Sequence, residues 1–144
     1  YGLFVNSGSS AIILGINALN LSKGDEVITA ACTFSTTIAP IIQCGLTPVF
    51  CDVEVGTYVP TAEQVCEKIT NKTKLILLPN LIGSKPDWRK IKEKIYQMAR
   101  PDIVLFEDSA DTITLTEETD ISITSFYSSH LITACGSGGM VMFN

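Results

Sequence analysis

Residues 2–29 read GLFVNSGSSAIILGINALNLSKGDEVIT, and this stretch decides the fold. Gly2 to Asn6 predict a strand that ends in the turn Ser7-Gly8-Ser9-Ser10. A helix is expected next, because apolar residues follow at helical spacing. These apolar positions are Ile12, Ile13, Ile16, Leu19 and Leu21. Lys23-Gly24-Asp25 ends the helix before the strand Glu26 to Thr29, so the stretch predicts a βαβ unit.

The same alternation of short apolar runs and amphipathic segments continues along the chain. Further helices are expected over residues 35–43, 62–69 with Thr61 as the N-cap, and 87–99. Further strands are expected over residues 48–52, 74–78, 103–107, 121–126 and 140–143. This alternation predicts one three-layer α/β domain, in which a mostly parallel mixed sheet is covered by helices on both faces.

Composition narrows the classes of function. The chain has 144 residues, 46% of them hydrophobic, which predicts a globular domain with a sizeable core. Its net charge of -5 argues against a nucleic-acid-binding surface, which needs clustered Lys and Arg. No apolar run approaches the roughly 20 residues that span a bilayer. Because the chain opens at Tyr1 without a methionine and stops at Asn144 just beyond an apolar run, we expect residues 1–144 to be a partial segment.

Cysteine spacing argues against two kinds of site. The cysteines lie far apart and form no CxxC pair: Cys32, Cys44, Cys51, Cys66 and Cys135. This pattern fits neither a zinc ribbon nor a redox motif, so no metal site is expected. Reduced cysteines beside apolar stretches behave as small hydrophobes, and we expect a cytoplasmic protein.

Polar residues gather where three of the predicted strands end. The clusters are residues 6–10, 107–111 and 125–130. Ligands of open α/β sheets bind beyond the carboxyl ends of the strands. We therefore expect a ligand site at this edge of the sheet.

The turn Ser7-Gly8-Ser9-Ser10 is a candidate anion site. It opens a helix, so its free amides and hydroxyls can bind an anion without a cationic side chain. Simple helix capping by the serines is the alternative. Ser125 could supply a second donor to a phosphate, and such a pocket would suit a phosphorylated cofactor.

Three further residues are candidates for the chemistry of the site. Asp108 ends a buried strand, where its carboxylate needs a partner, either a pyridinium nitrogen or donors of a loop. Phe34 could stack on a flat ring or pack in the core. His130 is the only histidine, and imidazole as a side chain can exchange a proton near neutral pH, so this residue either transfers protons or serves as a hydrogen-bonded structural residue.

Ordered motifs run along almost the whole chain. They are Asn6-Ser7-Gly8-Ser9-Ser10, Gly24-Asp25-Glu26-Val27-Ile28, Thr33-Phe34, Pro48-Val49-Phe50-Cys51-Asp52-Val53, Phe106-Glu107-Asp108, Ser125-Phe126 and Gly138-Gly139. Together they resemble the DegT/DnrJ/EryC1/StrS family of sugar aminotransferases and relatives, which use pyridoxal phosphate and have the fold of aspartate aminotransferase. The resemblance implies that residues 1–144 are the central portion of the large domain of a fold-type I enzyme, without its N-terminal segment and small C-terminal domain.

The resemblance also implies a role for most of the candidate residues. Ser9, Ser10 and Ser125 would hold the cofactor phosphate. Phe34 would stack on the pyridine ring, and Asp108 would pair with the ring nitrogen. The implied cofactor is pyridoxal 5'-phosphate or pyridoxamine 5'-phosphate.

His130 marks a branch within this family. The family's aminotransferases have the lysine that bonds to the cofactor four residues after the phenylalanine of Ser-Phe, and that position is His130 here. No lysine follows Lys94, so transamination through a lysine at this site is disfavoured. The same exchange is found in the 3-dehydratases of nucleotide-linked 4-keto-6-deoxy sugars, which Ser125-Phe126-Tyr127 and Glu107-Asp108-Ser109-Ala110-Asp111 also resemble. In that branch the histidine removes a proton from the C4′ carbon of the cofactor, and the C3 hydroxyl of the sugar leaves.

These resemblances predict a lyase that dehydrates C3 of a nucleotide-linked 4-keto-6-deoxyhexose in deoxysugar or surface-polysaccharide biosynthesis, with His130 as the base. Two alternatives stay open. One is a sugar aminotransferase of the same family, and the other is a non-catalytic relative that binds the cofactor or a sugar nucleotide. The resemblance further implies a nucleotide-sugar substrate and a homodimer for the full-length protein, and neither a nucleic acid nor a membrane is an expected partner.

Overall fold

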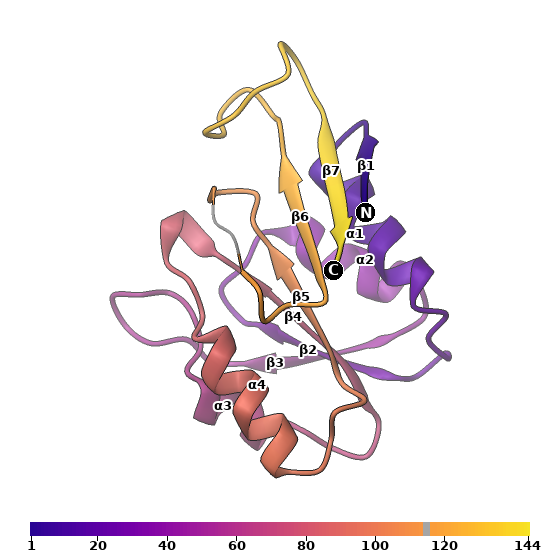
Figure 1. Cartoon of the computed structure of the whole chain (residues 1–144), viewed down its shortest axis with the longest axis vertical. Helices are drawn as coiled ribbons and strands as arrows, with labels where there is room; N and C mark the ends of the chain where they lie inside the picture. The colour runs from indigo at the N-terminus through magenta and orange to yellow at the C-terminus, as the bar shows by residue number, and fades with distance from the viewer. Residues whose placement is uncertain (114–115) are drawn as a thin grey trace.

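A mixed sheet of seven strands organises the chain in the computed structural model, which describes residues 1–113 and 116–144 (Figure 1). The strands are β1 (Gly2–Val5), β2 (Glu26–Ala30), β3 (Thr47–Cys51), β4 (Thr73–Pro79), β5 (Val104–Asp108), β6 (Ile121–Ser125) and β7 (Gly139–Phe143). Their order across the sheet is β1-β7-β6-β5-β4-β2-β3. β7 runs antiparallel to both of its neighbours, and the other paired strands are parallel. The predicted mostly parallel mixed sheet is confirmed.

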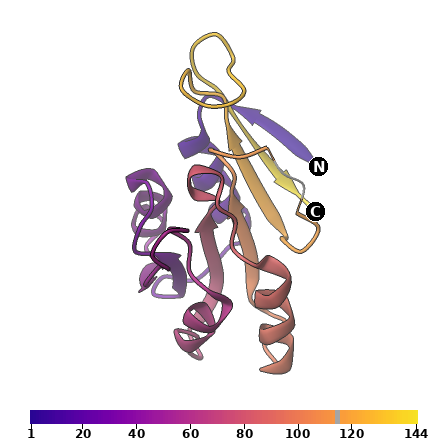
Figure 2. The same ribbon diagram turned by 90° about the vertical axis from the view of Figure 1, so that its left-hand side faces the viewer.

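Helices cover both faces of this sheet. They are α1 (Gly8–Ala18), α2 (Ser35–Gln43), α3 (Ala62–Glu67) and α4 (Trp88–Gln97), and a 3₁₀ turn, η1, spans Leu81–Gly83. α1 packs on α2, and α3 packs on α4. Figure 2 shows α2 and α4 on opposite sides of the sheet, which completes the three predicted layers.

Most element boundaries lie within two residues of the predicted ones, and α1 differs most. It starts at Gly8 because Ser7 is its N-cap, with the Ser7 side chain accepting a hydrogen bond from the Ser10 amide at 3.1 Å. It ends at Ala18, before the predicted apolar position Leu21, and Asn20 has a positive φ of 50° that helix geometry does not allow. The predicted N-cap Thr61 is confirmed and forms a capping box with Gln64.

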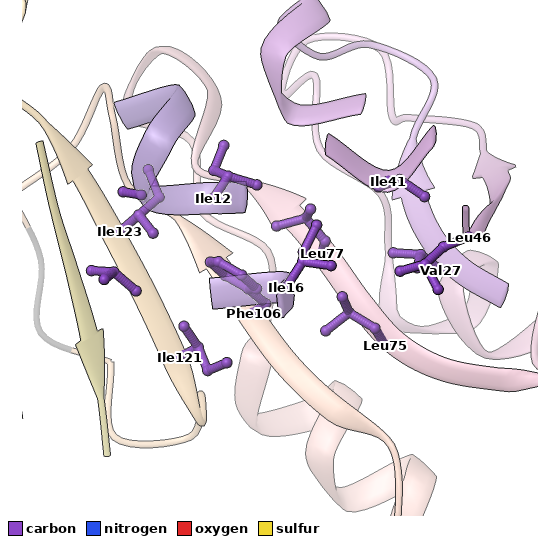
Figure 3. Close-up of a cluster of buried hydrophobic side chains, with 12 residues drawn as sticks. Ile12, Ile16, Val27, Ile41, Leu46, Leu75, Leu77, Phe106, Ile121 and Ile123 are labelled. Carbon is purple, nitrogen blue, oxygen red and sulfur yellow. The ribbon is translucent and has the colours of Figure 1, made fainter. Parts of the chain in front are cut away.

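The core is divided by the sheet into two clusters. Leu75 and Leu77 of β4 join the cluster under α1 and α2, whereas Ile76 and Leu78 join the cluster with α4. Figure 3 shows the first cluster, with Ile12 and Ile16 of α1 above the strands. Because side chains alternate across a strand, this division also decides which face each polar residue at a strand end will occupy.

α1 lies unusually close to the sheet at its glycines. A Cβ atom on Gly15 would lie 2.7 Å from two ring carbons of Phe106, and a Cβ atom on Gly8 would lie 2.9 Å from the Cβ atom of Ser125. Both distances are too short for real carbon atoms, so the two glycines permit the approach. The contact holds the first turn of α1 directly against the end of β6.

Some further features bear on the functional class. In the described part of the chain, no helix has the length and apolar character needed to cross a membrane. All five cysteines are free thiols. Among the described residues, no group of three or more His, Cys, Asp and Glu side chains could hold a metal ion.

Gly15→Ala tests the close contact between α1 and the sheet. Alanine at a helix interior normally stabilises by about 1 kcal/mol relative to glycine. Here the added methyl group meets the fully buried Phe106 ring, and overpacking costs about 1–3 kcal/mol, so we expect a net loss of up to about 2 kcal/mol in the free energy of unfolding. Denaturant unfolding measures it, with the exposed Asn17→Ala in the same helix as the control.

A double-mutant cycle then identifies the partner of the added methyl group. In a Phe106→Leu background the smaller side chain leaves space, so the Gly15→Ala substitution should cost less than it does in the parent chain. An unchanged cost in both backgrounds would assign the loss to another contact.

Candidate active site

The three polar clusters meet at one edge of the sheet and line one cavity. It encloses about 630 Å³, and its walls come from the turn before α1, the segment that leads into α2, and the segments after β4, β5 and β6. β1, β5 and β6 all point their carboxyl ends toward this edge, because β7 is antiparallel to both β1 and β6. The sheet topology therefore assembles residues that lie more than a hundred positions apart in the sequence.

One end of the cavity is rich in donors of hydrogen bonds to an anion. Ser7, Gly8, Ser9 and Ser125 line it, at the N-terminus of α1, where the first amides have no acceptor within the helix. The Ser125 side chain is buried against Gly8. Ser10 is not among the lining residues, and its hydroxyl accepts a hydrogen bond from the Ser7 hydroxyl at 3.1 Å.

Asp108 is a buried carboxyl group with neutral donors. The Thr37 hydroxyl donates to its Oδ2 atom at 2.8 Å, and the Ala110 amide donates to its Oδ1 atom at 3.2 Å. Burial raises the pKa of Asp108, and this effect exceeds the lowering by the Thr37 and Ala110 hydrogen bonds. A positively charged ligand group beside Asp108 would favour its charged form.

Asn80 is a residue of the cavity wall that the sequence analysis missed. Its Nδ2 atom donates to Glu107 Oε1 at 2.6 Å and to Ser109 Oγ at 2.8 Å, while the Thr116 hydroxyl also donates to Glu107 at 2.7 Å. A carboxylate only accepts hydrogen bonds, so Glu107 fixes the orientation of the amide. Asn80 is 1% exposed, and its Oδ1 atom has no hydrogen-bond partner among the described residues.

An unpaired buried carbonyl is costly, so Asn80 offers an acceptor to a ligand hydroxyl or N–H group. One signal could have identified this residue. Asn80 follows the buried strand β4 and is therefore a fourth polar position at the same sheet edge.

His130 lies in the cavity wall beside a carboxylate. Its Nε2 atom is 3.7 Å from Asp111 Oδ1, and its side chain is 20% exposed. The Tyr127 ring meets the imidazole edge to face with ring centroids 6.1 Å apart. Within the described residues the Nδ1 atom is buried and has no partner. The imidazole is thus not a fully hydrogen-bonded structural histidine.

Phe34 lies at the mouth of the cavity. It is the N-cap residue of α2, it lines the cavity, and its side chain is 68% exposed. The alternative of core packing is therefore wrong. An exposed aromatic ring here is free to cover a ligand.

The cavity combines an anion-binding end, a buried carboxyl group and an imidazole, and comparison with known proteins identifies the family. The model of the DegT/DnrJ/EryC1/StrS aminotransferase family matches residues 1–144. The chain belongs to this family. The expected family and its fold are both confirmed.

Individual relatives include enzymes of two reaction types. The dTDP-4-dehydro-2,6-dideoxy-D-glucose 3-dehydratase of Saccharopolyspora spinosa is 38% identical over 96% of this chain and 32% of its own length. The solved structure of NtdA from Bacillus subtilis with bound cofactor PMP superposes with a TM-score of 0.91 at 31% identity, over 99% of this chain and 33% of that one. The E. coli GDP-4-keto-6-deoxy-D-mannose-3-dehydratase with bound hydrated PLP gives 0.88 at 33% identity, over 99% and 39%. Sugar aminotransferases also match.

This chain spans about a third of the length of such relatives, between 32% and 38% for the first three curated ones. The expected cofactor agrees with the pyridoxal and pyridoxamine phosphates held by the solved relatives. The residues present fit such a group, because a phosphate suits the end of α1, a pyridinium suits Asp108, and a donor on the ring suits the unpaired Asn80 carbonyl.

Asp108→Asn tests the electrostatics of the unloaded site. Burial raises the pKa of Asp108 above its ordinary 3.8, so the folded chain binds this proton more tightly than the unfolded chain does. The resulting stabilisation is complete below the ordinary pKa and is lost as the pH rises through the raised folded-state pKa. Asn carries no charge, so without cofactor the variant should melt at a higher temperature than the parent near pH 7, and the difference should shrink toward about pH 4.

Thermal unfolding across this pH range measures the difference. The exposed Asp52→Asn is the matched control and should show no such pH-dependent gain. Identical pH profiles for Asp108→Asn and the parent would show that burial does not raise the pKa of Asp108.

Proposed function

We propose that residues 1–144 form the central portion of the large domain of a lyase that uses pyridoxamine phosphate to dehydrate C3 of a nucleotide-linked 4-keto-6-deoxyhexose. The observation that carries the proposal is His130, an imidazole with an unpaired Nδ1 atom in the wall of a cavity that no lysine of the described chain lines. An N-terminal segment and a small C-terminal domain would lie outside residues 1–144. The full-length protein would be a cytoplasmic homodimer.

Different residues around the cavity bind different parts of the cofactor. Ser9 and Ser125 hold the phosphate together with the first amides of α1, and Ser10 supports them through its bond with Ser7. Asp108 pairs with the ring nitrogen and keeps it protonated. When bound, the cofactor supplies an amine that condenses with the C4 ketone and a ring that accepts electrons.

The remaining polar and aromatic groups hold the ring in place. Asn80 presents its carbonyl to a donor on the ring, and its own amide is fixed by Glu107 and Ser109. Phe34 covers one face of the ring from the mouth of the cavity. Positioning of this kind keeps the reacting carbon at a constant distance from the base.

His130 moves the proton of the reaction. The Asp111 carboxylate, whose Oδ1 atom lies 3.7 Å from Nε2, would stabilise a proton on Nε2. Nδ1 would then be the basic nitrogen of the imidazole. With the cofactor bound, this nitrogen would accept the proton that leaves the C4′ carbon, and the Asp111 carboxylate would stabilise the imidazolium. The imidazolium would then return the proton to the departing C3 hydroxyl, so that it leaves as water.

A sugar aminotransferase is the second candidate, because such enzymes are among the relatives. It would need a lysine beside the cofactor. Lys85 comes shortly after the cavity residues Asn80 and Leu81 in the sequence, but it does not line the cavity. Its Nζ atom is 3.9 Å from Glu107 Oε1. Glu107 and Asp108 are neighbours on β5 and point to opposite faces of the sheet, so this lysine is bound on the face away from Asp108. The geometry therefore favours the lyase.

Serine variants test the phosphate end of the site. Ser9→Ala and Ser125→Ala each remove a hydrogen bond to a charged group, worth about 1.5–3 kcal/mol, so the Kd of pyridoxamine phosphate should rise about 10- to 150-fold. Ser10→Ala should have a smaller effect. Absorbance titration measures the affinity, and pyridoxamine without phosphate is the control ligand, whose Kd should stay constant. An equal loss of affinity for both ligands would show that the phosphate binds elsewhere.

His130→Asn tests the base in the complete enzyme that contains residues 1–144. Loss of a general base should lower kcat for C3 dehydration at least about 100-fold, while pyridoxamine phosphate still binds. The assay follows loss of the C3 hydroxyl by mass spectrometry with a panel of nucleotide-linked 4-keto sugars. Ser128→Asn, an exposed position in the same loop outside the cavity, is the control and should keep its activity.

Borohydride reduction separates the two reaction types. A transaminase should trap pyridoxal phosphate on a lysine, whereas the parent lyase should not, and His130→Lys should gain a trapped cofactor at residue 130. Undiminished dehydration by His130→Asn, or trapping on a lysine of the parent, would reject the proposed role of the imidazole.

A further inference from the structure

A smaller and more open hollow adjoins the cavity at the histidine. It encloses about 460 Å³ and is lined by Ile82, Gly83, Asp111, Ser129, His130 and Leu131. Asp111, Ser129 and His130 also line the cavity, so the two spaces meet at the imidazole. The residues that line the hollow alone, Ile82, Gly83 and Leu131, have no side-chain donor or acceptor. Three of the six lining residues are therefore polar and shared with the cavity, and the other three are apolar.

Ile82 has a backbone conformation that its side chain disfavours. Its φ of 53° and ψ of 34° lie in the left-handed region, where a β-branched residue is rare, and its side chain is 78% exposed. Two backbone hydrogen bonds of 2.9 Å hold the turn. Before the turn the Asn80 amide donates to the Asp108 carbonyl, and after it the Ser84 amide donates to the Leu81 carbonyl. Glycine or asparagine would relieve the strain, so folding alone does not explain an exposed isoleucine here.

Leu131 supplies a second aliphatic side chain to the hollow. It follows His130 directly and is 70% exposed. Two branched aliphatic groups thus line the same hollow as one acid–base group without belonging to either core cluster. Exposed apolar side chains that converge beside a reactive group indicate contact with a ligand.

We propose that Ile82 and Leu131 form a wall that receives the C6 methyl group of the sugar and selects it against a C6 hydroxymethyl group. This assignment of substrate class rests on the proposed function. Binding is more favourable when a methyl group leaves water and packs against two aliphatic side chains. A hydroxyl in the same place loses its water and finds no side-chain donor or acceptor on Ile82, Gly83 or Leu131.

The test uses two sugars that differ only at C6, with methyl or hydroxymethyl, as 4-keto sugars linked to dTDP and to GDP, the nucleotides of two relatives. The complete enzyme loaded with pyridoxamine phosphate should favour the methyl sugar about 100-fold in kcat/KM. Ile82→Asn and Leu131→Asn should each reduce this ratio to about tenfold or less. Asparagine tolerates the left-handed conformation, so Ile82→Asn should not melt at a lower temperature than the parent.

A binding experiment separates this inference from the proposed reaction. Calorimetric titration with the corresponding 4-hydroxy sugar nucleotides, which do not react, should show the same preference for methyl and the same loss of preference in both variants. Ile42→Asn, an equally polar change at a 62% exposed isoleucine on α2 outside both spaces, is the control and should leave the ratio unchanged.

The outcomes are distinct. Dehydration of both sugars with a ratio that neither variant alters would overturn the wall and leave the lyase intact. Absent dehydration with a binding preference that both variants abolish would overturn the lyase and keep the wall as a binding surface. Equal binding of both sugars by the parent would overturn the wall whatever the reaction is.

Discussion

The close approach of α1 to the sheet is the constraint on which the site depends. Gly15 allows the helix to lie on the Phe106 ring, and Gly8 allows its first turn to touch Ser125. A Cβ atom on Gly139 of β7 would lie only 2.4 Å from the backbone of Ser7. A methyl group added at either glycine of the helix would push the helix away from the sheet, because the packed core has no space for it. The free amides of the helix would then move away from Ser125. Core packing and the anion-binding end of the cavity are thus one arrangement.

Alternation along β5 divides two adjacent carboxyl groups between two tasks. Glu107 points toward the cluster with α4 and is satisfied by Asn80 and Thr116. Asp108 points toward α2, and burial raises the pKa of Asp108 despite the hydrogen bonds from its neutral donors. A satisfied network rigidifies the wall, whereas an under-satisfied carboxyl group keeps affinity for a cationic ligand. Of these two neighbouring residues, Glu107 therefore contributes to stability, and in the proposed function Asp108 would contribute to binding.

Sequence periodicity predicted the elements well because the two core clusters impose it. β4 alternates between them, and the apolar positions of α1 face one of them. Strand ends then located Asp108, Ser125 and His130 at one edge. Periodicity carries no information on contacts between distant residues, so the role of Glu107 in orienting Asn80 was not visible. The left-handed Ile82 was also unpredictable, because local preference argues against it.

The turn at Ile82 connects the two halves of the site. Its amide makes a long hydrogen bond of 3.5 Å to Asp111 Oδ2, while the other oxygen of that carboxylate faces His130. Asn80, which precedes the turn, is anchored by Glu107 behind the sheet. The strain in the turn is therefore balanced by bonds that also fix the carboxylate beside the imidazole. In the proposed function His130 is a base without a covalent bond to the cofactor, so its position would depend on these neighbours alone.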